Sequence, residues 1–84
     1  MSRLPLRELR SLTARQLIAA LRRDGFLLDR ARGSHQHFRH PDGRRVTVTY
    51  HAGGNTFPHK TLRSMLELQA RWTENDLRRL GLLP

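Results

Sequence analysis

The amino-acid sequence predicts a single α+β domain, in which a helix is followed by three antiparallel strands and a second helix. The main observations are an amphipathic segment that ends at Gly25, three short extended segments separated by turns, and a second amphipathic segment after Pro58. A chain of 84 residues has room for one small core. Because the connections are too short for parallel crossovers, we expect an antiparallel sheet with the helices packed on one face.

The first helix is expected over residues 13–24. Thr13 begins a capping-box pattern, apolar residues then recur at helical spacing, and Gly25 suits the position just after a helix. The preceding residues 1–12 predict an N-terminal arm, extended or with one short helical turn. Residues 13–84 form the predicted domain.

The three strands are expected over residues 26–30, 34–40 and 45–50. The first ends before Gly33, and Asp42-Gly43 provides the positive φ angles that a tight hairpin turn needs.

The second helix is expected to begin at Pro58. Its apolar stripe is assigned to Leu62, Met65 and Leu66, with Leu68-Gln69 as an optional continuation. A further capping pattern at Thr73 predicts a short C-terminal helix that ends by Leu80, before Gly81.

Side chains alternate between the two faces of a strand, so sequence parity predicts which of them point away from the helices. Phe38, Val46, Val48 and Tyr50 are expected to face the helices. The open face would then carry three histidines and an arginine among threonines: His35, His37, Arg39, Thr47, Thr49 and His51. A solvent-exposed sheet face ordinarily does not carry several histidines beside an arginine, so this face is a candidate for ligand binding.

The charge indicates a polyanionic partner. The formal net charge is +9, and arginine accounts for all but one of the 16 basic residues. Arginine grips phosphate with two parallel hydrogen bonds. Cysteine is absent, which excludes disulfides and thiolate sites, and no apolar run is long enough to span a membrane. With no secretory signal at the start, we expect a cytoplasmic protein.

Three interpretations of the histidines remain open at this point. They can be polar strand residues without a task, metal ligands, or proton-transfer groups. A metal site is disfavoured because the chain has no thiol and only Asp42 lies near in sequence. Proton transfer fits the charge, since an unperturbed imidazole titrates near pH ~6.5 and can deprotonate the 2′-hydroxyl of RNA.

Such a reaction requires no metal and no cofactor. The basic residues expected nearest to the His35 segment, or to the loop that faces it, are Arg32, Arg39 and Lys60, which would neutralise the phosphate. Gly33-Ser34 permits a sharp turn that leaves backbone N–H groups free for phosphate.

Several segments, in this order, resemble the HicA toxin family. They are Gly25-Phe26, Gly33-Ser34-His35 with Phe38, Asp42-Gly43-Arg44-Arg45-Val46-Thr47-Val48, His51, and Thr61-Leu62-Arg63-Ser64-Met65-Leu66. The resemblance implies a fold like that of double-stranded-RNA-binding domains (dsRBD-like). It also implies ribosome-independent cleavage of mRNA by the toxin of a type II toxin–antitoxin system, with His35 as the catalytic residue. A HicB-family antitoxin would bind the toxin and cover this histidine.

The residue that assists His35 is left open among Ser34, His37, His51 and water. Two other classes of function also remain. One is a non-catalytic RNA-binding module, because the same fold binds duplex RNA by shape and phosphate contacts. The other is a protein-interaction domain whose charge matches an acidic partner.

Overall fold

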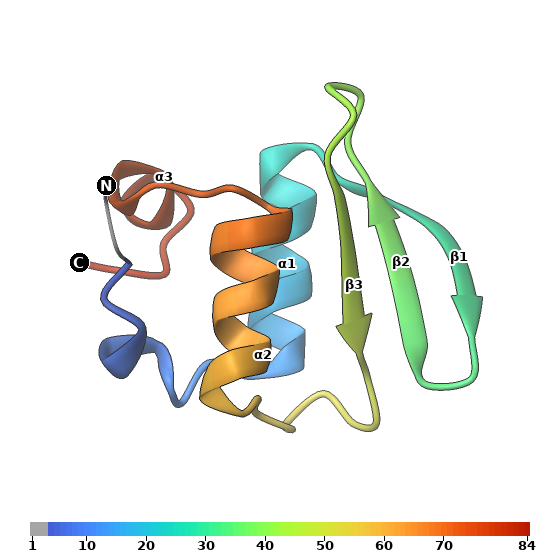
Figure 1. Ribbon diagram of the computed structural model, residues 1–84, viewed down its shortest axis with the longest axis horizontal. Coiled ribbons are helices and arrows are strands. Elements are labelled where there is room, and N and C mark those ends of the chain that lie inside the picture. The colour runs from blue at the N-terminus through green and yellow to red at the C-terminus, as the bar shows by residue number, and fades with distance from the viewer. Residues whose placement is uncertain (1–3) are drawn as a thin grey trace.

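A computed structural model describes residues 4–84, so residues 1–3 of the expected arm lie outside the described residues. The elements follow in the predicted α-β-β-β-α order, and the fold class is confirmed (Figure 1). They are a 3-10 turn η1 (Leu6–Leu9), α1 (Ala14–Asp24), β1 (Leu27–Arg32), β2 (His35–Arg39), β3 (Arg45–Thr49), α2 (His59–Arg63), a π-helical segment η2 (Ser64–Gln69) and α3 (Glu74–Arg79).

The three strands form one antiparallel sheet in the order β1-β2-β3. Gly33 and Gly43 both adopt positive φ angles, of 57° and 99°, in the turns between the strands. A β-bulge interrupts the β1–β2 pairing between Leu28 and Arg30. β1 is therefore less regular than its neighbours, and it lies one to two residues later in the chain than predicted.

Both predicted ends of α1 are present. The Gln16 backbone N–H donates to the Thr13 hydroxyl at 3.2 Å, and the Thr13 N–H donates to the Gln16 side chain at 2.9 Å. At the other end Gly25 has a φ of 105°, and its N–H donates to the Arg22 carbonyl at 3.0 Å. The capping box and the left-handed glycine thus limit the helix to the expected residues.

The second helix differs from its prediction in one respect. Pro58 caps α2, and the helix then widens, because the Ala70 N–H bonds to the Met65 carbonyl five residues earlier. Leu62 and Met65 are buried as expected, but Leu68 is 57% exposed, so its assignment to the apolar stripe was wrong. Leu68 follows Leu66 by two residues, which is roughly 200° around a regular helix, so the helical period itself places it on the outer face.

The core lies between the helices and one face of the sheet. Phe38, Val46 and Val48 are buried against the helices, and Tyr50 is half-buried beside them, as parity predicted. The N-terminal segment also contributes to this core through Leu4, Leu6, Leu9 and Leu12, which are all buried.

Asp24, the last residue of α1, joins several elements. Its carboxylate, only 5% exposed, accepts a hydrogen bond from the Trp72 indole at 2.8 Å and lies within 3.2 Å of the Arg44 guanidinium and 2.5 Å of that of Arg79. Burial acts to raise the pKa of Asp24, but the hydrogen bonds from Trp72 and Arg79 and the charges of Arg79 and Arg44 outweigh it and leave that pKa below its ordinary value.

Candidate functional site

The open face of the sheet is built from three cross-strand rows. Strand pairing and side-chain alternation place these rows one behind another on the face opposite Phe38 and Val46. From the β1–β2 turn onwards the rows are Arg32–His35–Thr49, Arg30–His37–Thr47 and Leu27–Arg39–Arg45. The helices lie to the other side of the sheet, with β1 at its outer edge (Figure 1).

His35 begins β2 directly after the turn. Its side chain is exposed, and its backbone pairs with Arg32 on one side and Thr49 on the other. Gly33 has the left-handed φ of 57° that the turn requires, with open space where a side chain would be. The Ser34 carbonyl accepts the Tyr50 N–H at 2.6 Å, which fixes the end of β3 beside this turn.

The loop that carries His51 is held in place at both its ends. The Asn55 side chain accepts the N–H groups of His51 and Ala52 at 3.2 and 3.1 Å. The first two N–H groups of α1 then donate to loop carbonyls, Ala14 to Asn55 at 2.8 Å and Arg15 to Gly53 at 3.0 Å. His51 directly follows Tyr50, so its backbone lies at the same end of the sheet as His35 and is not free to swing away.

Two other histidines are engaged in the fold. His37 is half-buried, and its Nδ1 hydrogen-bonds the Thr47 hydroxyl at 3.0 Å across the β2–β3 pair. The Nδ1 of His40 accepts the Asp42 N–H at 3.0 Å, so its Nε2 carries the hydrogen that is donated to the Asp24 carbonyl at 2.8 Å. His40 therefore joins the β2–β3 hairpin to the end of α1 and is a structural residue.

The structure places two of the expected basic residues on the open face and the third at the start of α2. Arg32 and Arg39 share the open face with His35, and both are exposed. Lys60 is exposed in the first turn of α2, which belongs to the helical layer behind the sheet. Within residues 4–84, no hydrogen bond or ion pair joins Lys60 to the His35 segment.

Two arginines of the open face, Arg30 and Arg45, were missed in the sequence reasoning. Parity along β3 would have found Arg45, which alternates with Thr47 and Thr49. Arg30 required the bulged β1–β2 register, which parity does not give. In the part of the chain that the structure describes, the four arginines of this face form no ion pair, whereas Arg44, Arg63, Arg78 and Arg79 all do. The unpaired basic charge of the sheet is therefore concentrated on the open face that carries His35.

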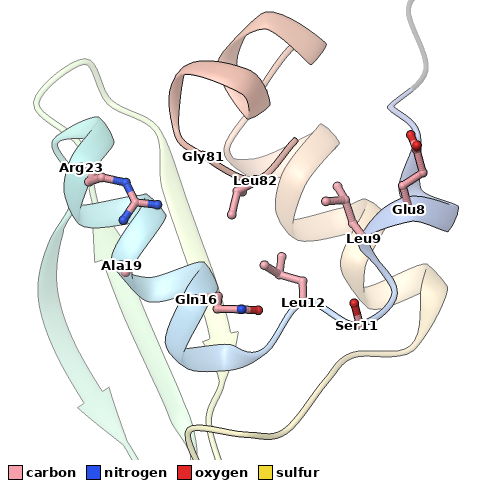
Figure 2. A pocket seen from close by; sticks show the side chains of 9 residues that line it. All are labelled: Glu8, Leu9, Ser11, Leu12, Gln16, Ala19, Arg23, Gly81 and Leu82. Carbon is pink, nitrogen blue, oxygen red and sulfur yellow. The ribbon is translucent and has the colours of Figure 1, made fainter. Parts of the chain in front are cut away.

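A groove of about 320 Å³ lies elsewhere, between the N-terminal segment, α1 and the C-terminal residues (Figure 2). Leucines 9, 12 and 82 line it together with Gln16 and Arg23. Two of its polar side chains are already used by the fold, since Gln16 caps α1 and Arg23 donates to the Leu80 carbonyl at 2.5 Å. Glu8 and Ser11 are the remaining polar side chains in its lining.

Two further features of the described residues concern metal ions and membranes. Among residues 4–84, no three histidine or acidic side chains converge as a metal-binding group would require. None of the described helices has the length and apolar character to cross a membrane.

Comparison with known families decides the class. The model of the family described as HicA toxin of bacterial toxin–antitoxin systems matches residues 14–71 of this 84-residue chain. The chain belongs to the HicA toxin family. The match contains α1, the whole sheet and α2, while the N-terminal segment and α3 lie outside it. The protein is therefore the toxin of a toxin–antitoxin system, and His35 lies within the shared domain. A search of curated proteins found no match.

Proposed function

We propose that this HicA-family toxin is a ribosome-independent endoribonuclease that cuts mRNA in the cytoplasm and thereby stops translation and growth. The observation that carries the proposal is the row Arg32–His35–Thr49, in which an exposed imidazole pairs across the strands with an arginine on an otherwise open sheet face. A toxin needs a damaging activity, and this row supplies both a proton-transfer group and a phosphate-binding group.

The reaction follows from these groups. His35 takes the proton from a ribose 2′-hydroxyl, and the resulting oxygen attacks the adjacent phosphorus. The bond from phosphorus to the 5′-oxygen breaks, giving a 2′,3′-cyclic phosphate and a 5′-hydroxyl end. The leaving 5′-oxygen receives a proton from the imidazolium or from a second group, for which His37, His51 and Ser34 are the candidates. Arg32 lies on the neighbouring strand to neutralise the charge on the phosphoryl oxygens.

Substrate binding is assigned to the rest of the open face. Arg39 and Arg45 lie directly opposite each other in the β2–β3 register. Like charges at such positions repel, so the pair is costly unless an anion lies between them. An RNA strand that runs along the open face would place one phosphate there and a scissile phosphate further along near His35, with Gly33 and Ser34 offering backbone N–H groups.

A non-catalytic RNA-binding module is the second candidate. The same arginines favour it, because phosphate contacts alone hold RNA without chemistry. It gives no role to His35, whereas the nuclease requires it. We further propose that a HicB-family protein encoded beside the toxin is its antitoxin and neutralises it by covering His35.

Cleavage of a labelled mRNA in the presence of EDTA separates these functions. We expect the wild-type chain to cut and His35→Ala to lose at least about 100-fold in rate, the lower bound for a general acid or base. His59→Ala is the matched control, since His59 is exposed on α2 in the other layer and should leave the rate unchanged. Equal cutting by His35→Ala would remove this residue from the mechanism. RNA binding without cutting by the wild type would identify the binding module.

A further inference from the structure

The first strand is uncovered to an unusual degree. All six residues of β1 are exposed, and Leu27 and Leu28 keep 70% and 45% of their surface accessible to solvent. In residues 4–84 Leu68 is the only other large apolar side chain with such exposure. Two adjacent exposed leucines on a strand indicate a surface that a partner covers.

The backbone of β1 is equally unoccupied on its outer side. At the opposite edge of the sheet, the Thr47 N–H donates to the Gln69 side chain at 2.8 Å, so η2 covers β3. Apart from its pairing with β2, the Leu27–Arg32 backbone makes no backbone hydrogen bond within residues 4–84. One edge of the sheet is thus closed and the other is open to strand addition.

The alternation of hydrogen bonds along the sheet identifies which backbone groups of β1 point away from β2. The Tyr50-to-Ser34 and His40-to-Arg44 bonds show that the even-numbered residues of β2 bond to β3. The odd-numbered residues of β2 therefore bond to Leu27, Arg30 and Arg32, and the N–H and C=O groups of Leu28 and Ala31 point outward.

A hollow lies at the beginning of this edge. Its volume is about 400 Å³, and its lining includes Leu27, Leu28 and Pro41 together with the charged residues Asp29 and Arg39. An apolar side chain fits the leucines and proline, and a carboxylate beside it would meet Arg39. The apolar part of the hollow suits an apolar side chain, and Arg39, Arg30 and Arg32 outnumber Asp29 along this edge, so a chain in which apolar and acidic residues alternate fits it.

We propose that β1 is the docking edge for an extended acidic polypeptide, which adds to the sheet as a fourth strand. A second copy of this chain is disfavoured because pairing two β1 strands would bring Arg30 and Arg32 against their own copies in a molecule of net charge +9. The assignment of this strand to the antitoxin rests on the proposed function, whereas the docking edge itself does not. Because Arg32 pairs with His35, the far end of such a strand would lie beside the candidate catalytic row.

The proposal is tested with a synthetic seven-residue peptide, Glu-Val-Glu-Leu-Glu-Val-Glu, capped at both ends and labelled for fluorescence anisotropy. We expect the full chain to bind it and Leu27→Ser/Leu28→Ser to bind about tenfold more weakly, since less apolar surface is buried. Leu68→Ser is the matched control, because this leucine is exposed on η2 and should not affect binding.

A second peptide separates strand addition from simple charge attraction. Methylation of alternate backbone nitrogens leaves every side chain and charge in place but removes the hydrogen bonds along one edge. We expect the peptide methylated on its bonding edge to lose binding, and the amides of Leu28 and Ala31 to gain protection from hydrogen exchange only with the unmethylated peptide.

Three results would overturn the proposal: no binding, equal binding by both peptides, or β1-mediated dimers of the chain in sedimentation. All measurements are made without RNA and are repeated with His35→Ala. If the chain binds the peptide but does not cut mRNA, the nuclease proposal is contradicted and the docking edge is retained. If it cuts mRNA but does not bind the peptide, the docking edge is contradicted and the nuclease proposal is retained.

Discussion

Replacement of Arg39 and Arg45 by alanine tests whether the open face binds RNA through its unpaired arginines. The two residues face each other across β2 and β3, both are exposed, and neither forms an ion pair within residues 4–84. Their removal relieves a like-charge contact, so the double variant should unfold at the same temperature or a higher one. RNA affinity should nevertheless fall, which separates a binding defect from a folding defect.

The size of the effect follows from the number of arginines. Arg30, Arg32, Arg39 and Arg45 together predict a slope of log affinity against log salt near −2.8, taking about −0.7 for each phosphate on a single strand. Raising the salt concentration about fourfold would then weaken binding of the wild-type chain about 50-fold. With two arginines left the slope becomes about −1.4, and the same change in salt weakens binding only about sevenfold.

The assay is a salt titration of binding to a fully 2′-O-methyl oligonucleotide, which lacks the attacking hydroxyl and stays intact. Arg63→Ala/Arg78→Ala is the matched control. It removes the same charge, but from arginines that are already paired with Glu67 and Glu74 on helices. An equal decrease of slope in both double variants would show that net charge, and not the open face, governs binding, and the reasoning would fail.

Three further substitutions test the fold that holds this face. Asp24→Asn should lower the free energy of unfolding by about 1.5–3 kcal/mol, because a buried charged hydrogen-bond acceptor is lost. As the pKa of Asp24 is lower in the folded state, its contribution is present above about pH 4 and disappears as the pH falls through the folded pKa. Asp24→Asn should therefore reduce the loss of unfolding free energy between neutral and acid pH, as measured by urea titrations. An unchanged loss would contradict the role given to Asp24. Gly25→Ala should lower the free energy of unfolding by about 1–2 kcal/mol, since φ is 105° and the added Cβ would lie 3.0 Å from His40 Nε2. An unchanged melting temperature would refute this. Thr13→Ala should cost about 1 kcal/mol in chemical unfolding through loss of its bond from Gln16, whereas Thr13→Ser should not.

Local signals in the sequence were sufficient for much of the fold. The Thr13 cap and Gly25 limit α1 because both act within one helical turn. The Asp42-Gly43 turn sets the register of β2 against β3, and parity then places Phe38 and Val46 on the buried face. The exposure of His35 follows from the same alternation, while its catalytic role stays a prediction.

Other features depend on contacts between distant segments, which one sequence does not display. The bulge at Leu28 and Arg30 shifts the parity of β1, so the partners of His35 and His37 on that strand required the structure. Lys60 lies in the first turn of α2, so its approach to His35 depends on how α2 packs against the sheet, and its role beside His35 stays a prediction. Asp24 gave no local signal, since a carboxylate at a helix C-terminus opposes the helix dipole and only distant partners explain it.

The open face and the open edge together bear on how so small a toxin is controlled. Its helices cover a single face of the sheet, and the Asp24 contacts join α1 to the β2–β3 hairpin and to α3, which leaves little within the domain that could close over His35. Inhibition must then come from outside. A strand added along β1 would end beside Arg32, whose partner is His35, so binding at the edge and occlusion of the row would be one event. The acidic residues of such a strand would also compete with phosphate for the same arginines. On this reasoning RNA and the acidic polypeptide exclude each other through charge and position, with no change of fold in the toxin.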